Sequence, residues 1–84
     1  MFFVEQRMSD IPKPILEKAV KINGAMKRAY LALYRAGEPV TPDEIARKLG
    51  HERAYIHMRL NQLELMGYVK RTREGRNVKF QVII

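Results

Sequence analysis

The stretch Thr41–Val69 decides the fold of this chain and reads TPDEIARKLGHERAYIHMRLNQLELMGYV. Its first part carries the signals that begin and end a short helix. Thr41 is suited to cap the helix, Pro42 suits the first helical position, and Glu44 completes a Thr-x-x-Glu capping box. Gly50 then ends the helix, because glycine adopts a left-handed backbone conformation at little cost. The sequence therefore predicts a short helix between Thr41 and Gly50.

A second helix is predicted over residues 51–66. Its apolar residues Ile56, Leu60 and Leu63 follow one another at steps of four and three, so they share one helical face. Both predicted helices are short and amphipathic, and each needs a further surface on which to bury its apolar face. Two such helices joined at a glycine are typical of a helix-turn-helix.

The residues after Met66 predict a hairpin. Gly67 ends the preceding helix, and residues 68–73 and 77–84 are predicted as two strands around Glu74-Gly75-Arg76. Apolar and polar residues alternate along the second strand, so one face is expected to be buried and the other not. The residues expected on the buried face are Val78, Phe80, Val82 and Ile84.

The run GHERAYIHMRLNQLELMGYVKRTREGRNVKFQV, residues 50–82, resembles the recognition helix and wing of winged helix-turn-helix regulators of the ArsR-like and MarR-like groups. With the preceding helices, the resemblance covers roughly residues 24–84. The matching residues are Ile56, Leu60, Leu63, Glu64 and the Gly67-Tyr68-Val69 step before the basic hairpin. The resemblance implies an α+β fold, a three-helix core with a C-terminal β-hairpin wing over residues 68–84, and pairing of Val40 with that hairpin.

The residues before this motif predict an N-terminal extension. Residues 1–13 are expected to form an arm that packs on a partner subunit, frays, or lies as a strand on its own domain. Residues 14–36 show helical periodicity and are expected to form one long helix in which Gly24 is tolerated. The alternative is that Asn23 caps a new helix that starts at Gly24. Residues 14–84 are then a single domain, in keeping with the short chain.

Positive charge is concentrated in the second half of the chain. Residues 47–84 contain nine Lys or Arg against three Asp or Glu, whereas residues 1–46 contain seven against six. Such an uneven distribution is typical of a protein that binds nucleic acid. The sequence has no Cys, no run of apolar residues that would span a membrane and no signal peptide, so we expect a cytoplasmic protein without membrane contact.

Helical geometry selects the candidate DNA contacts, because the buried face of the second helix fixes its outward face. Residues on that face are expected to read base edges in the major groove, while others meet phosphate. The expected base contacts are Arg53, His57, Met58 and Asn61, with Ala54 close to the bases. The expected phosphate contacts are Tyr55, Arg59 and Gln62. In the alternative, Arg53 and Arg59 lie on a solvated face and pair with Glu52 or Glu64.

The hairpin contributes a second set of cations. A basic wing beside a recognition helix suits contact with the DNA backbone or minor groove. The alternative is a charged strand edge that prevents unwanted strand pairing. The wing residues expected to contact DNA are Lys70, Arg71, Arg73, Arg76 and Lys79.

No constellation of catalytic residues is visible. His51 and His57 stand without Cys or clustered carboxylates, so neither a metal site nor a nucleophile–base pair is predicted, and no cofactor is expected. The sequence lacks the Cys or His clusters of ArsR-like metal sensors. It also lacks the additional helices around the ligand pocket of larger MarR-like proteins, so no small-molecule effector is expected.

The predicted function is a small transcription regulator that binds double-stranded DNA as a homodimer. The alternatives are a winged-helix protein-interaction module of a transcription or repair complex, and an RNA-binding or architectural protein.

Overall fold

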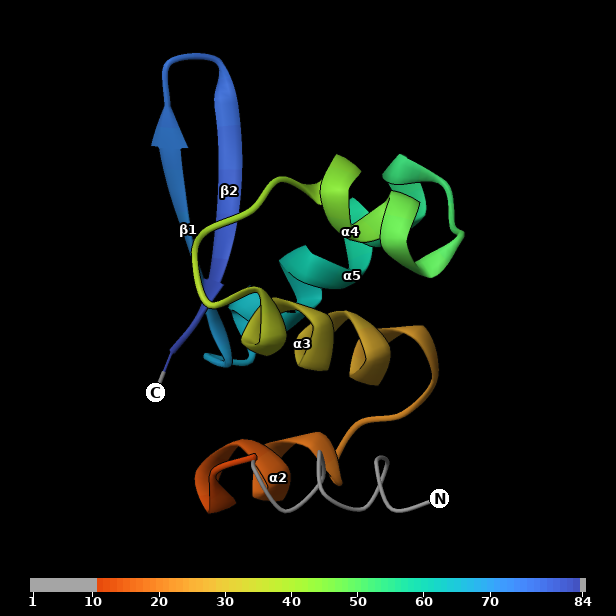
Figure 1. Ribbon diagram of the computed structural model, residues 1–84, viewed down its shortest axis with the longest axis vertical. Helices are drawn as coiled ribbons and strands as arrows, with labels where there is room; N and C mark the ends of the chain where they lie inside the picture. The colour runs from red at the N-terminus through yellow and green to blue at the C-terminus, as the bar shows by residue number, and fades with distance from the viewer. Residues whose placement is uncertain (1–10, 84) are drawn as a thin grey trace.

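The computed structural model describes residues 11–83, so most of the arm predicted for residues 1–13 lies outside the described residues, as does Ile84. Within the described range, four helices precede a two-stranded antiparallel sheet (Figure 1). In chain order the elements are α2 (Lys13–Ala19), α3 (Gly24–Ala36), α4 (Pro42–Leu49), α5 (Arg53–Leu65), β1 (Val69–Glu74) and β2 (Asn77–Val82). This is the α+β winged helix-turn-helix architecture that the sequence predicted.

The helix predicted over residues 14–36 is in fact two helices. α2 ends at Ala19, and α3 begins at Gly24, whose φ of +63° lies outside the helical region. Asn23 occupies the N-cap position in an extended conformation, although its side chain makes no capping hydrogen bond. The expectation of one continuous helix is therefore wrong, and a new helix at Gly24 is correct. The apolar periodicity continues across the break because both helices bury a face in the same core.

α4 has the predicted capping box. The hydroxyl oxygen of Thr41 accepts a hydrogen bond from the Glu44 backbone N–H at 3.3 Å, and Oε1 of Glu44 accepts one from the Thr41 backbone N–H at 3.0 Å. Gly50 ends the helix with a φ of +75°, and its N–H donates to the carbonyl oxygen of Ala46 at 2.8 Å. Both signals read from the sequence are confirmed.

α5 is slightly shorter than the predicted range of residues 51–66. Ile56, Leu60 and Leu63 are fully buried, as their spacing predicted. They pack in one cluster with α3 residues such as Leu33 and with hairpin residues such as Phe80. The core therefore lies among the four helices and the hairpin, and the face of α5 opposite the three apolar residues is left toward solvent.

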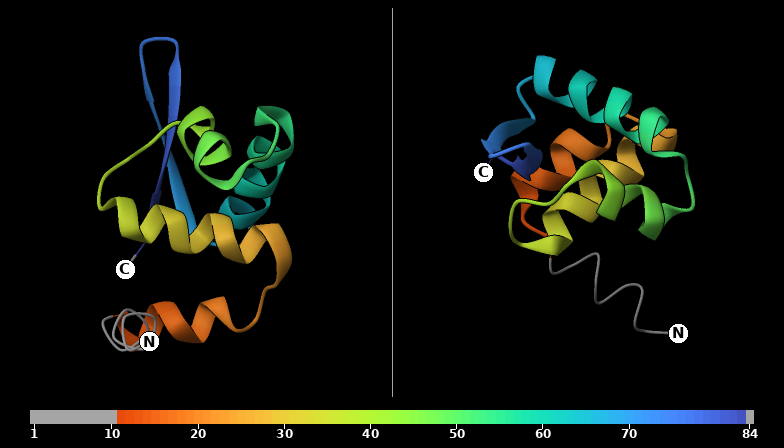
Figure 2. Two further views of the ribbon diagram at one scale, coloured as in Figure 1. Left: turned by 45° about the vertical axis from the view of Figure 1, so that its right-hand side comes forward. Right: turned by 90° about the horizontal axis from the view of Figure 1, so that it is seen from above.

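The hairpin pairs Val69 with Val82 at its base and Glu74 with Asn77 at its tip. Gly75 is the first of the two turn residues and has a φ of +62°, which suits the tight turn of a two-residue hairpin loop. The hairpin extends past the helices as a narrow projection (Figure 2). Its two short strands thus hold the cationic turn away from the core and beside the start of α4.

Several contacts tie the hairpin to the rest of the domain. Val40 forms an isolated antiparallel bridge with Phe80, with N···O distances of 3.0 and 2.8 Å, as the family resemblance implied. Tyr68, just before β1, has its ring centroid 5.5 Å from that of Tyr30 in α3 and 5.6 Å from the ammonium nitrogen of Lys18 in α2.

No helix in the range 11–83 is long and apolar enough to cross a membrane.

Candidate nucleic-acid interface

The residues of α5 outside its buried face divide into three strips along the helix, because each residue turns the side chain by about 100°. The first strip faces the hairpin, the second is outermost, and the third faces the turn between α2 and α3. The first strip holds Arg53, His57 and Glu64, the second Ala54, Met58 and Leu65, and the third Tyr55, Arg59 and Gln62. The predicted base and phosphate contacts are therefore spread over three surfaces.

The first strip meets the hairpin in a small hollow, which we call the helix–wing groove. Its volume is about 90 Å³, and α5, the hairpin tip and the start of α4 all contribute to it. Its lining residues are Arg53, His57, Arg76, Asn77, Val78, Thr41, Pro42 and Asp43. The structure thus brings together three residues that the sequence singled out, Arg53, His57 and Arg76, from two separate elements.

His57 is held against the hairpin. Its ring meets the Phe80 ring edge-on, with centroids 5.9 Å apart and an interplanar angle of 76°. Phe80 is fully buried and His57 is half-buried, so the packing fixes the imidazole beside β2. The imidazole is thus held at the groove wall by its packing on β2.

Arg53 forms an ion pair that the sequence did not predict. Its Nε lies 2.9 Å from Oδ1 of Asp43 in the first turn of α4. The sequence-based alternative had paired Arg53 with Glu52 or Glu64, which are neighbours on or beside its own helix. Asp43 was missed because only the packing of α4 against α5 brings it close. Its one local signal was an acidic residue directly after the Thr41-Pro42 cap.

The outermost strip is open to solvent. Ala54 is exposed, Met58 is 48 % exposed and Leu65 is 88 % exposed. Asn61, between the outermost strip and the hairpin side, is half-buried, and its Oδ1 is shielded from solvent without a hydrogen-bond partner in the described part of the chain. In this conformation Asn61 offers no free carbonyl oxygen to a base, whereas Ala54 and Met58 offer apolar contact.

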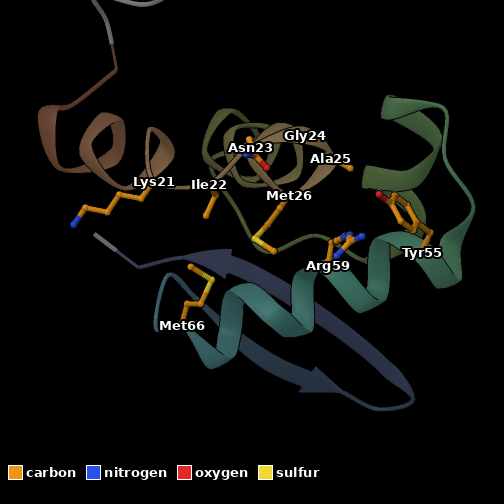
Figure 3. A pocket seen from close by; sticks show the side chains of 9 residues that line it. All are labelled: Lys21, Ile22, Asn23, Gly24, Ala25, Met26, Tyr55, Arg59 and Met66. Atoms are coloured by element: carbon orange, nitrogen blue, oxygen red, sulfur yellow. The ribbon is translucent and has the colours of Figure 1, made fainter.

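The third strip forms a separate site. The Arg59 guanidinium carbon lies 4.8 Å from the centroid of the Tyr55 ring, and Nη1 of Arg59 donates to Oε1 of Gln62 at 2.8 Å. Tyr55 and Arg59 also line a cavity of about 420 Å³ between α5 and the α2–α3 turn (Figure 3). The remaining lining residues are Lys21, Ile22, Asn23, Gly24, Ala25, Met26 and Met66. The three predicted phosphate contacts therefore do not share the helix–wing groove.

The wing cations differ in their surroundings. Arg73 and Arg76 are exposed near the hairpin tip and form no salt bridge within residues 11–83. Nη2 of Arg71, by contrast, lies 3.2 Å from Oε1 of Glu64 and so links the hairpin to α5. Near the turn, Arg73 and Arg76 are thus available to an external anion, whereas Arg71 is already paired.

Lys70 and Lys79 lie on the other face of the hairpin. Successive strand residues point to opposite faces, and Phe80 faces α5, so its neighbour Lys79 points away from α5. Lys70 is directly opposite Gln81 and shares that face. Nζ of Lys79 lies 3.0 Å from Oε1 of Glu74, and this hydrogen bond, with the charge of Glu74, raises the pKa of Lys79 above its ordinary value. These two cations contribute to the field around the wing rather than to the groove itself.

Comparison with solved structures establishes the fold. The YusO protein from Bacillus subtilis superposes with a TM-score of 0.70 at 17 % identity, over 95 % of this chain and 57 % of that one. The oxidized form of MarR from E. coli superposes with a TM-score of 0.66 at 18 % identity, over 87 % of this chain and 64 % of that one. This chain therefore spans less than two thirds of the length of either protein.

Comparison at the level of sequence identifies one family. No curated protein sequence matches the chain. The sequence pattern that defines the MarR family matches residues 28–77, which is more than half of the chain and includes α4, α5, β1 and most of α3. Of the ArsR-like and MarR-like groups that the sequence resembled, this match selects the MarR-like group. The chain belongs to the MarR family.

Proposed function

We propose that this chain is a transcription regulator that binds double-stranded DNA, and that it is not an enzyme. In this proposal α5 enters the major groove and the hairpin contacts the backbone or minor groove beside it. Family membership supports the proposal, and so does the excess of positive charge in residues 47–84.

The observation that carries the proposal is the helix–wing groove. In helix-turn-helix docking, the N-terminal part of the recognition helix approaches the bases. Arg53 is the first residue of α5, His57 follows one turn later, and both line a hollow with Arg76 of the wing. A single polyanion lying along this surface meets the helix start and the wing tip together.

The proposed roles follow the three strips of α5. Arg53 suits a guanine, and Ala54 and Met58 suit the methyl group of thymine. His57 is a polar contact at the groove edge, and Asn61 suits an adenine once its side chain turns outward. Tyr55, Arg59 and Gln62 are placed to meet phosphate along the opposite flank, while the wing set Lys70, Arg71, Arg73, Arg76 and Lys79 supplies sequence-independent attraction.

We further propose that the working form is a homodimer. Some large apolar side chains are exposed although they have no role in the proposed DNA contacts. They include Val20, which is 71 % exposed, and Leu65, which is 88 % exposed. Burial of such residues against a second copy would remove them from water. Two recognition helices related by a two-fold axis would then meet half-sites about 34 Å apart. Sedimentation equilibrium tests this, and a monomer at concentrations that saturate DNA would contradict it.

The deciding experiment is selection of bound duplexes from a randomised pool, followed by affinity measurements against salt. A DNA-binding regulator enriches a defined sequence, and its affinity falls with a log–log slope near −0.9 for each phosphate neutralised. Arg53→Ala should cost about 1–3 kcal/mol on the enriched site. Arg35→Ala, which removes an exposed cation of α3, is the matched control. A protein-interaction module would instead show no enriched sequence and little duplex binding at physiological salt.

A further inference from the structure

Asp43 is an acidic residue in a groove whose other charged residues are cations. It lies at the second position of α4, directly after Pro42 and within the capping box that fixes the start of this helix. Among residues 11–83, the other charged residues that line the groove are Arg53 and Arg76. A carboxylate here repels DNA phosphate, so on charge alone it lowers affinity.

The contact to Arg53 uses one particular part of the guanidinium. Oδ1 of Asp43 lies 2.9 Å from Nε, the nitrogen nearest the aliphatic stem. The guanidinium carries five N–H donors in a rigid planar fork, four of them on the two Nη atoms. A carboxylate on the Nε side therefore leaves one N–H of each Nη at the far end. Those two donors form the pair that matches O6 and N7 of guanine.

The backbone geometry makes this contact an orienting one. Asp43 is anchored by the capped start of α4, and Arg53 is the first residue of α5. Ile45 of α4 and Ile56 of α5 are buried in the same core, so the two helices are held together below the groove. The Asp43 backbone is thus held in place, so its short side chain presents the carboxylate from a narrow region beside the Arg53 side chain, which is longer and has many more rotamers.

The pair does little for the unbound protein. The side chains of Arg53 and Asp43 are 63 % and 54 % exposed, and ion pairs at such positions add little to stability because water screens them. Docking of a duplex would exclude that water and strengthen the attraction between the two charges. The benefit of the contact therefore appears when DNA is bound at the correct base, not before.

We propose that Asp43 is a positioning residue that sets base specificity by holding the Arg53 guanidinium in the orientation that meets guanine. The proposal rests on the proposed function, since it assumes that α5 reads DNA. It names Asp43 as a determinant of selectivity that weakens general affinity. Arg53 remains the residue that touches the base.

The test compares base preference among variants of the full chain. Wild type, Asp43→Ala, Asp43→Asn, Arg53→Ala and the double alanine variant are each titrated with the selected duplex and with duplexes changed at one guanine at a time. Glu17→Ala in α2 removes the same charge far from the groove and is the matched control. Thermal unfolding in the same buffer checks that each variant is folded.

The expected result has four parts. Asp43→Ala loses about tenfold of its preference for one guanine, and it binds unrelated duplexes more tightly than wild type does, because a negative charge is gone. Asp43→Asn retains part of the preference, because its amide oxygen still accepts from Nε. The double variant shows no more loss than Arg53→Ala alone. Glu17→Ala leaves the base preference unchanged.

Two results would overturn the proposal while leaving DNA binding intact. The first is that Asp43→Ala binds all duplexes more tightly by the same factor and keeps every base preference. Asp43 would then act only through its negative charge. The second is that Asp43→Ala loses a base preference that Arg53→Ala leaves unchanged, which would mean that Asp43 acts through a residue other than Arg53. Absence of duplex binding by the wild-type chain would instead overturn the proposed function, and this inference with it.

Discussion

Replacing Thr41 by alanine removes one half of the capping box at the start of α4. The Thr41 hydroxyl oxygen accepts from the Glu44 N–H at 3.3 Å, and the hydroxyl also contacts Oε1 of Glu44 at 3.2 Å. Loss of an N-cap hydroxyl costs about 1 kcal/mol, within a range of roughly 0.5–2 kcal/mol. For a domain of this size, 1 kcal/mol corresponds to a fall of about 4–8 °C in the unfolding temperature. We expect Thr41→Ala to show that fall.

The effect also depends on pH. Hydrogen bonds from Thr41, first from its backbone and then from its side chain, lower the pKa of the Glu44 carboxyl below its ordinary value. A group whose pKa is lower in the folded state stabilises the fold fully above its unfolded pKa, and the stabilisation disappears as pH falls through the folded pKa. Part of the difference between wild type and Thr41→Ala should therefore disappear at about pH 3.

Circular dichroism at neutral and at acidic pH measures both effects. Thr41→Ser is the control, because it keeps the hydroxyl and should stay within a few tenths of a kcal/mol of wild type. An alanine variant as stable as wild type would refute the capping argument. A serine variant as unstable as the alanine one would show that the methyl group matters instead. A difference that does not shrink in acid would contradict the assignment to ionised Glu44.

Three further predictions concern single side chains. Arg76→Ala should weaken binding to every duplex alike and reduce the salt slope by about 1, measured by fluorescence anisotropy against Arg35→Ala; an unchanged slope would remove the wing tip from the interface. Tyr30→Phe should raise the free energy of unfolding in urea by about 1 kcal/mol, because the buried hydroxyl has no partner within residues 11–83; a loss of stability would mean that the hydroxyl is bonded after all. Leu60→Ala should lower that free energy by about 2–5 kcal/mol, because Leu60 is fully buried; a loss below 1 kcal/mol would contradict its place in the core.

The features that were predictable from the sequence are those that depend on near neighbours. The Thr41–Glu44 box, the Gly50 terminus and the buried face of α5 each rest on residues within a turn or two of one another. The break before α3 is also local, but its signal was weak. Asn23-Gly24 is compatible with a tolerated glycine and with a new helix start, and only the positive φ of Gly24 decides between them.

The groove was less predictable, because it is made by tertiary packing. Arg53, His57 and Arg76 were each selected for their own element, yet nothing in their spacing indicated that they share a hollow. Asp43 was missed for the same reason. Tyr55 and Arg59 were placed on the correct helix, but the cavity beside them depends on the α2–α3 break that the periodicity concealed.

The bridge between Val40 and Phe80 has a mechanical consequence. Val40 immediately precedes Thr41, so one short segment holds the hairpin on one side and the start of α4 on the other. Because Val40 and Thr41 are consecutive residues, we expect movement of the hairpin to shift the start of α4 as well, so that the two walls of the helix–wing groove are mechanically coupled. If the chain binds DNA as proposed, this coupling sets the width of the helix–wing groove in the free protein, so little free energy is spent on ordering the groove when a duplex binds.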